Sequence, residues 1–420
     1  MNRDFRLFWA GETVSLFGSQ VTVLALPLTA ITVLDAGALE LGLLGMASYL
    51  PLVVLALPAG VVVDRYRRRP LMIVANLVQA AALGAVPLLV VLRELTGGRL
   101  LATAMVAGAG RVLFELAYRS YLPSLVPSGQ LTAANARLTS SESLAEVGGP
   151  AAGGWLVTAL GAPFTLLLDT VSFVVSTVTL SRIRSAEPAP AAEPGRRPRA
   201  ELAASFRFTF ANPYLRAFLG EAATYNLFWQ IVQTLLTLYA IETLRLSPAA
   251  LGLVLAVGSA GALLGAMLAG PAASRFGLGR TVVTAAVIGD AAPLVLPFVA
   301  PGPAAAAVLG AAFFVRGIGI TGCNVHVIAI RQTVTPQRLL GRTTAAYQLV
   351  GHGVIPIGAL AGGLLGLRLG IRPTLLLAVV GLLATCLWLI FSPVRRATSL
   401  HEIAETVERE APGVRHRRVG

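Results

Sequence analysis

The sequence predicts an all-α membrane protein with twelve transmembrane helices in two pseudo-symmetric six-helix bundles. Three observations support this prediction. The 420 residues are 55% hydrophobic and 13% charged, with a mean hydropathy of +0.75, whereas soluble domains carry about 25% charged residues. The apolar residues fall in blocks of about 20 or more, long enough to cross roughly 30 Å of hydrocarbon as helices. These blocks form two sets of six, separated by a polar segment near the middle of the chain.

The twelve apolar blocks are the expected spans, and they lie near residues 8–34, 39–63, 70–92, 100–121, 138–160, 162–183, 214–241, 248–272, 280–300, 303–330, 343–367 and 373–393. No short charged stretch with a small-residue cleavage site precedes the first block, so that block is expected to remain as a span. The segment RSAEPAPAAEPGRRPRAE between the sets is rich in Pro, Ala and charge, which favours an extended linker. The expected parts are therefore an N-terminal half (1–183), a linker (184–212), a C-terminal half (213–393) and a tail (394–420).

The charged residues are too scattered to form a nucleic-acid-binding surface. The net charge is +13, but the basic residues stand in short clusters between apolar blocks. All of them are Arg, which excludes a Gly-Lys-Ser/Thr phosphate loop and makes a built-in ATPase unexpected. Cys323 and Cys386 lie inside apolar blocks and show no metal or disulfide spacing. We therefore expect no cofactor, no metal ion and no nucleic-acid partner.

The arginines also predict the orientation in the membrane, because basic loops stay on the cytoplasmic side. Most of them lie in the first six residues, the 65–69 loop, the linker, later loops of the same parity and the tail. The other side has only Arg93, Arg99, Arg245, Arg368 and Arg372. Both termini are therefore expected in the cytoplasm of a multi-pass cell-membrane protein. The tail segment TSLHEIAETVERE has apolar residues at helical spacing, which predicts a short helix.

An internal repeat relates the two sets of spans. A shift of about 210 residues places GVVVDRYRRR, beginning at Gly60, on GPAASRFGLGR, beginning at Gly270. Give or take one residue, the same shift places Pro127 on Pro336, and the Gly153–Gly154 pair on a second glycine pair at 362–363. Several matches at one offset indicate two halves built alike. Asp64 faces Ser274 in the copy, so the acid belongs to one half only.

The loop pattern G-x-x-x-D-R followed by basic residues resembles the signature loop of the major facilitator superfamily. The segment GGPAAGG, residues 148–154, is similar to the Gly-Pro motif of that superfamily's proton-coupled exporters. Together with PSLVP, LTAANA and LDTVSF, it resembles the drug-exporter branch that includes macrolide efflux proteins and siderophore exporters. The resemblance covers residues 1–393. The family loop usually has Gly where this chain has Arg67, while the copy keeps Gly277, so the first turn is expected to be less sharp.

Two arginines lie deep within predicted spans, where a charged side chain costs roughly 2.5–3.5 kcal/mol and is a functional candidate by default. Arg111 is at about half depth in the fourth block, and Arg316 is similarly deep in the tenth. The resemblance implies a central cavity lined by helices one, four, seven and ten, where both guanidinium groups could bind an anionic or hydrogen-bond-accepting substrate group. The alternative for Arg111 is an ion pair with Glu115, one turn away. Glu12 and Glu221 lie on the first and seventh blocks, which are also implied cavity helices.

Three carboxylates are candidates for proton coupling. Glu115 precedes Arg119 by four residues, so the two share a helix face. Glu142 and Glu146 are also four apart, and because adjacent carboxylates repel when both are ionised, one of them is expected to hold a proton near neutral pH. The alternative is that these acids pair with Arg119 or Arg137.

Four further ionisable residues are expected to be structural. Asp169 and Asp290 lie on the sixth and ninth blocks, which the resemblance places outside the cavity, and they are expected to make hydrogen bonds in the packing. His326 and His352 could titrate near neutral pH. A lone histidine near a helix end is more often a satisfied packing residue, and this is the reading expected for both.

The motifs supply the candidate gating residues. Glycines around a proline allow close helix approach and a bend. The resemblance implies that Asp64 docks at the start of helix eleven, near residues 342–344, with Arg119 as an alternative partner. The candidate gating residues are Gly60, Asp64, Arg65, Arg68, Arg119, Gly149, Pro150, Gly153 and Gly154.

These patterns predict a secondary transporter that exports an amphipathic small molecule by alternating access, with proton antiport. The expected partners are the lipid bilayer, the substrate and protons, and the expected state is a monomer. A siderophore exporter or an importer of the same fold is the alternative within the class. A polytopic membrane enzyme is the alternative from another class, but H-E-x-x-H, G-x-S-x-G and Cys-His clusters are missing from the sequence.

Overall fold

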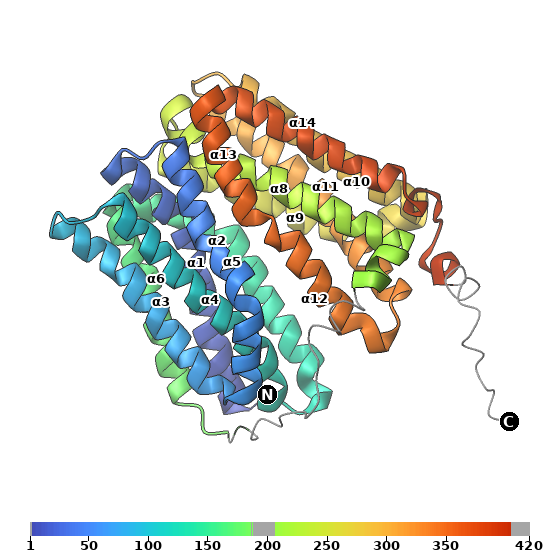
Figure 1. Cartoon of the computed structure of the whole chain (residues 1–420), viewed down its shortest axis with the longest axis horizontal. Coiled ribbons are helices and arrows are strands. Elements are labelled where there is room, and N and C mark those ends of the chain that lie inside the picture. Colours follow the sequence, from blue (N-terminus) through green and yellow to red (C-terminus); the bar gives the residue numbers. More distant parts are fainter. Residues whose placement is uncertain (1, 186, 188–205, 405–420) are drawn as a thin grey trace.

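The computed structural model describes residues 2–185, 187 and 206–404, and its regular structure there is helical (Figure 1). The helices before the linker are α1 (Arg3–Leu34), α2 (Ala38–Arg65), α3 (Arg68–Val91), α4 (Gly97–Leu125), η1 (Ser128–Gln130), α5 (Leu131–Leu160) and α6 (Ala162–Ser181). Those after it are α8 (Pro213–Leu238), η2 (Tyr239–Thr243), α9 (Pro248–Phe276), α10 (Leu278–Ala291), η3 (Ala292–Phe298), α11 (Ala305–Val334), α12 (Gln337–Gly353), α13 (Ile355–Leu369), α14 (Ile371–Ile390) and η4 (Pro393–Arg396).

Each of the twelve apolar blocks contains a helix, so the prediction of an all-α membrane protein is confirmed. Within the described ranges, ten helical segments are long and apolar enough to cross a membrane. In that set, α10 continues through η3, and α12 runs into α13 across a break near Val354. Helices α5 and α8 are of similar length, 30 and 26 residues, but are not among the ten. Twelve spans in two six-helix bundles therefore stay a prediction.

Local sequence explains where several helices begin and end. Asn2, Thr96, Asn212 and Ser247 precede α1, α4, α8 and α9, and each accepts a hydrogen bond from a backbone N–H of the first turn. Gly277 ends α9 with a φ of +85°, which other residues adopt only with strain. The connections between successive spans within each set are short, so successive spans alternate in direction.

The signature loop and its copy fold differently. Between α9 and α10 stands only Gly277, in the left-handed region. Between α2 and α3 stand Tyr66 and Arg67, both extended, and Arg67 has a φ of −62°. Arg67 therefore needs none of glycine's conformational freedom, and the first turn is one residue longer than its copy.

Helices on each side of the linker pack mainly with one another. Before it, α1 packs on α5 and α6, and α3 on α4 and α6; after it, α9 packs on α11, and α8 on α13 and α14. The main packing between the two sets is α5 on α9 and α2 on α13. In Figure 1 the blue-to-green helices lie to the left of the yellow-to-red ones. We call the end of the molecule where α1 begins and α6 ends the terminal side, and the opposite end the far side.

Among the described residues, the buried apolar core that joins the two sets lies on the far side. One continuous core there includes Leu28 of α1, Leu41 of α2, Leu235 of α8 and Leu251 of α9. On the terminal side each set has a core of its own, one around Phe5 and Tyr121, the other around Phe218 and Ile330. The structure is therefore closed between the sets on the far side and divided on the terminal side.

The start of the tail packs on the second set. The backbone N–H groups of Leu278 and Gly279 donate to the carbonyl oxygens of Thr398 and Ala397. Residues 400–404 are helical, and Ile403 among them is 1% exposed. The rest of the predicted tail helix lies outside the described residues.

Candidate functional site

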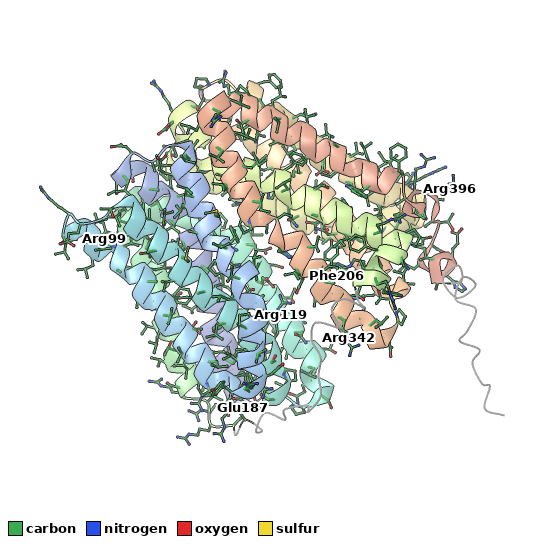
Figure 2. All side chains as sticks on the ribbon, viewed as in Figure 1. Arg99, Arg119, Glu187, Phe206, Arg342 and Arg396 are labelled. Carbon is green, nitrogen blue, oxygen red and sulfur yellow. The ribbon has the colours of Figure 1, made fainter. Side chains whose placement is uncertain are left out.

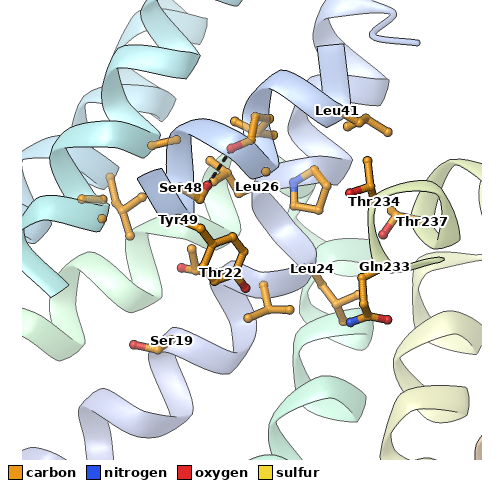
Figure 3. Close-up of a pocket in the computed structure, with 18 of the residues that line it drawn as sticks. Ser19, Thr22, Leu24, Leu26, Leu41, Ser48, Tyr49, Gln233, Thr234 and Thr237 are labelled. Carbon is orange, nitrogen blue, oxygen red and sulfur yellow. Dashed lines mark hydrogen bonds between the residues drawn. The ribbon is translucent and has the colours of Figure 1, made fainter. Parts of the chain in front are cut away.

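A cavity of about 240 Å³ lies between the two sets of helices, just inside the far-side core (Figure 3). Side chains from α1, α2, α3, α4 and α6 form one wall, and side chains from α8 and α9 form the other. The apolar lining includes Leu24, Leu26, Pro27, Leu41, Leu44, Leu251 and Leu255. The polar lining comprises Ser19, Thr22, Ser48, Tyr49, Gln79, Arg111, Asp169, Gln230, Gln233, Thr234 and Thr237. A mostly apolar hollow with a few polar groups is the usual form of a small-molecule site.

Glycine contacts close the far side of this cavity. A Cβ at Gly154 of α5 would lie 2.4 Å from the carbonyl oxygen of Pro248, and one at Gly252 of α9 would lie 2.2 Å from that of Pro150. A Cβ at Gly42 of α2 would similarly lie 2.7 Å from the α carbon of Gly363 on α13. Because real Cβ atoms do not approach so closely, only glycine permits these two helix pairs to meet.

The other motif glycines have different neighbours. A Cβ at Gly149 would meet Gln20, and one at Gly153 would meet Val21, so both glycines serve the packing of α5 on α1 within the first set. Gly60 has open space where a Cβ would be. Of the predicted gating glycines, Gly154 is the one that touches the second set.

Arg111 lines the cavity and forms an ion pair on its own helix. Its Nε lies 2.9 Å from Oε1 of Glu115, the alternative that the sequence left open. The two side chains are 63% and 43% exposed, which leaves the pair accessible from the open part of the molecule. Arg119 continues the same helix face and is exposed on the terminal side, as is Arg342 on α12 (Figure 2).

Arg316 lies apart from this cavity lining, against aromatic residues of α8. Its guanidinium carbon is 3.3 Å from the ring centroid of Trp229, and the same guanidinium donates a hydrogen bond to the hydroxyl of Tyr225. Such stacking on the ring face stabilises a cation. Its buried Nε has no hydrogen-bond partner among the described residues. The structure therefore does not bring Arg316 and Arg111 into one pocket lining.

The predicted coupling acids gather around Glu12 in the first set. Glu12 is 9% exposed, and the charges of Glu142 and Glu115 act on it electrostatically. Glu142 and Glu146 are exposed and act on each other one turn apart on α5. Nearby, Trp9 donates a hydrogen bond to Ser141, with Arg137 over its ring 5.9 Å from the centroid. Three carboxylates from α1, α4 and α5 thus face a common region.

Asp169 corrects an expectation from the sequence. It was expected outside the cavity, but it is part of the cavity lining, where it is 1% exposed and accepts hydrogen bonds from Thr22 and Ser172 at 2.5 and 2.9 Å. The physical reason is the close packing of α6 on α1, since a Cβ at Gly18 would lie 2.5 Å from an oxygen of Asp169. The expected structural hydrogen bonds are present all the same.

The remaining ionisable candidates lie in the second set. Asp290 is 2% exposed and accepts hydrogen bonds from Thr385 and Cys386. Glu221 of α8 lies close enough to Asp290 for the two charges to interact. His326 contacts the carbonyl oxygen of Ala269 at 3.0 Å. His352 contacts a carbonyl oxygen of its own helix at 3.2 Å. Among the described residues there is no group of His, Cys, Asp and Glu arranged to hold a metal ion.

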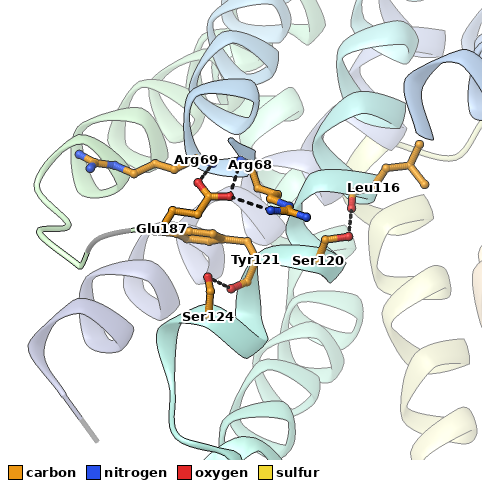
Figure 4. A network of polar contacts seen from close by, with 7 residues as sticks. All are labelled: Arg68, Arg69, Leu116, Ser120, Tyr121, Ser124 and Glu187. Atoms are coloured by element: carbon orange, nitrogen blue, oxygen red, sulfur yellow. Dashed lines mark hydrogen bonds and ion pairs between the residues drawn. The ribbon is translucent and has the colours of Figure 1, made fainter. Parts of the chain in front are cut away.

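Two features of the site were missed from the sequence. The polar face of α8, from Gln230 to Thr237, carries a readable signal, since WQIVQTLLT places polar residues at i, i+3, i+4 and i+7 of an apolar helix. The second is Glu187 at the start of the linker, whose carboxylate binds the signature loop at Arg68 (Figure 4). Its sequence neighbourhood gives no such signal.

Comparisons with known proteins agree with this geometry. The family model described as transmembrane secretion effector matches residues 1–416. The multidrug efflux pump Tap of Mycolicibacterium fortuitum is 27% identical over 394 residues, which cover 91% of this chain and 94% of that protein. Macrolide efflux protein A of Streptococcus pyogenes is 27% identical over 180 residues, 43% of this chain and 44% of that one.

Solved structures show the same fold. A bacterial homologue of the iron transporter ferroportin in an inward-facing state aligns with a TM-score of 0.72 at 19% identity, over 92% of this chain and 98% of that one. The outward-facing state of a bacterial ferroportin homologue aligns with a TM-score of 0.60 at 18% identity, over 93% of this chain and 99% of that one.

Proposed function

Because this chain belongs to the transmembrane secretion effector family, in the drug-exporter branch of the major facilitator superfamily, we propose that it exports amphipathic small molecules from the cell by alternating access. The observation that carries the proposal is the cavity itself, which lies between two separately packed sets of helices and is closed on one side only. The relatives' names as multidrug and macrolide efflux proteins support antibiotics or other natural products as substrates.

Residues 1–183 and 213–393 would act as two six-helix halves that rock about the cavity. The cores on the terminal side are already separate, so each half keeps its own packing when the halves move. The far-side core and the contacts of Gly154 and Gly42 would have to part in the opposite state. The linker and the tail would stay outside the membrane as connecting and peripheral segments.

The arginine bias supports a cytoplasmic terminal side, so this structure would correspond to the inward-open state. Substrate would then enter from the cytoplasm or the inner leaflet and reach the cavity past Arg119 and Arg111. The protein would work as a monomer, since the cavity lies within a single chain. The lipid bilayer is then its main physical partner.

Proton antiport would use the acids around Glu12. A buried carboxylate favours its neutral form, and neighbouring negative charges act in the same direction. Glu115 shares its carboxylate with Arg111, so protonation of Glu115 would release the guanidinium toward the cavity. If these groups bind a proton and the substrate in turn, proton entry would be coupled to substrate export.

The proposal is tested by the accumulation of a labelled compound panel, including erythromycin, in cells with and without the protein. We expect lower accumulation in cells that contain the protein, and we expect a protonophore to remove the difference. Equal accumulation of the whole panel would contradict export. A difference that survives the protonophore would retain export and contradict proton coupling.

A further inference from the structure

The cavity wall formed by α8 carries a continuous polar face. Gln230, Gln233, Thr234 and Thr237 follow the i, i+3, i+4, i+7 pattern, which places them on one side of a helix. All four line the cavity, and none of them is ionisable. Figure 3 shows Gln233, Thr234 and Thr237 at the cavity from the α8 ribbon. A neutral hydrogen-bonding surface therefore faces the apolar residues of α1 and α2.

Two oxygens of this face lack a partner. Oε1 of Gln233 and Oγ1 of Thr234 are buried and have no hydrogen bond among the described residues. Thr234 is 8% exposed. Buried polar groups are hydrogen-bonded in the great majority of cases, and an unmet one is costly. A ligand group in the cavity could therefore supply the missing hydrogen bonds to these two oxygens.

Thr234 differs from Thr224 of the same helix. Thr224, ten residues earlier on α8, donates its hydroxyl to the carbonyl oxygen of Gly220 at 2.7 Å, as helical threonines commonly do. Thr234 makes no such bond. Its hydroxyl oxygen thus remains available to a group in the cavity.

Three polar side chains of the opposite wall already have partners. Thr22 donates to Asp169, Ser48 donates to the carbonyl oxygen of Leu44, and Arg111 pairs with Glu115. Among the described residues that line the cavity, the buried polar atoms without a hydrogen-bond partner both lie on α8. The amide oxygen of Gln233 only accepts, and the hydroxyl oxygen of Thr234 can accept. A hydrogen-bond donor of the ligand complements both oxygens.

The cavity size limits how much of a ligand it encloses. Its volume of about 240 Å³ is below the usual range of drug-sized pockets, roughly 300–1,000 Å³. Leu24, Leu41 and Leu251 supply apolar surface around the polar face. One hydroxyl-bearing ring or similar group of a larger molecule fits this description, with its apolar body extending toward the divided side.

We infer that Gln233 and Thr234, flanked by Gln230 and Thr237, form a specificity subsite for a hydroxyl or amide N–H group of the substrate. This inference rests on the proposed export function and narrows its substrate class to amphipathic molecules with hydrogen-bond donors. The subsite selects such molecules over equally apolar ones that carry no donor.

The test compares erythromycin, whose sugars carry hydroxyl groups, with tetraphenylphosphonium, an apolar cation without a hydrogen-bond donor. Binding to purified full-length protein and export from cells are measured for both. Gln233→Leu and Thr234→Val are each expected to weaken erythromycin binding roughly tenfold, which corresponds to one buried hydrogen bond, and to change tetraphenylphosphonium binding less than twofold. Thr234→Ser keeps the hydroxyl and is expected to bind erythromycin as the wild type does.

Thr224→Val is the matched control, because it removes a hydroxyl from the same helix that bonds only to the backbone. Equal loss of both probes in the subsite variants, or loss of neither, overturns the subsite. Export of tetraphenylphosphonium alone by the wild type also overturns it, while the proposed function stands. If the wild type neither binds nor exports either probe, the subsite is overturned, and the proposed function fails as well only when the whole compound panel accumulates equally with and without the protein. Variants that do not fold are recognised by their size-exclusion profile. Gln233→Asn, which shortens the side chain and withdraws the amide oxygen, then replaces Gln233→Leu in the comparison, with the same expected loss of erythromycin binding.

Discussion

Glu187, which follows the last helix of the first set, binds the first turn of α3. Its Oε1 accepts a hydrogen bond from the backbone N–H of Arg68 at 2.6 Å, and its Oε2 accepts one from that of Arg69 at 3.1 Å (Figure 4). The guanidinium of Arg68 lies 3.6 Å from Oε1. The side chain of Glu187 is 6% exposed. Since the first N–H groups of a helix have no partner within it, this acid acts as a cap supplied by the linker.

Glu187→Ala is therefore expected to destabilise the first set of helices. Loss of two hydrogen bonds to a mostly buried carboxylate corresponds to about 2 kcal/mol, and we expect the apparent Tm in detergent to fall by a few degrees. The matched control is Glu94→Ala, because Glu94 pairs with Arg99 at 2.7 Å while both side chains are about half exposed. Exposed pairs contribute roughly 0–1 kcal/mol, so a fall in Tm equal to that of the control would contradict the capping role.

Asp64 is the acid of the signature loop itself, at the end of α2, and its expected role is to hold the terminal side closed in the opposite state. Asp64→Asn is expected to insert normally, to cut export, and to shift the balance of the two states roughly two- to fivefold toward the one seen here, the worth of a carboxylate at a helix N-terminus. Labelling of Ala345→Cys on α12 measures the shift, because both native cysteines are buried. Asp64→Ser, which copies Ser274 of the other half, is expected to behave alike.

The control for this substitution is Asp35→Asn, which changes the same group at the far end of α1. Asp35 ends α1 with a φ of +50°, a conformation that Asn also tolerates. It should leave labelling and export unchanged. If Asp64→Asn has the export and labelling rates of the wild type, Asp64 does not hold the terminal side closed.

The positions of the helices could be predicted from the sequence because each span needs about 20 apolar residues in a row, and no other requirement hides that signal. Arg111 and Glu115 are four residues apart, so helix geometry had offered their ion pair as the alternative to substrate contact, and the structure contains it. The sequence did not predict as well which helices face the cavity. Asp169 reaches it because α6 packs closely on α1, a tertiary relationship without local sequence signal.

Contacts between distant segments account for the rest of what was missed. Glu187 and Arg68 are separated by 119 residues, and the linker composition predicted only an extended chain. The contacts of Arg316 with Trp229 and Tyr225, two aromatic residues on another helix, also had no local sequence signal. The closed far side depends on glycines that meet across the two sets, such as Gly154 and Gly252.

Gly154→Val is expected to open the far side. The added Cβ would lie 2.4 Å from the carbonyl oxygen of Pro248, which is backbone and cannot rotate away. We expect export to fall more than tenfold. We also expect Val157→Cys to be labelled faster, because Val157 of α5 belongs to the far-side core and is 5% exposed. Gly98→Val at the start of α4, where a Cβ meets open space, is the control. Slow labelling and full export in Gly154→Val would show that the contact is dispensable for closure.

Proton coupling is expected to depend on the acids that surround Glu12. Gln variants of Glu12, Glu115 and Glu146 keep the size of each side chain and remove its ability to carry a proton. In proteoliposomes with a trapped pH dye, addition of substrate to the wild type should release protons along with transport. At least one of the three variants is expected to lose proton release and gradient-driven export while it still binds substrate, because binding and coupling use different groups. Glu94→Gln on the far-side loop should behave as the wild type does. Undiminished proton-driven export in all three variants would exclude Glu12, Glu115 and Glu146 as the coupling site.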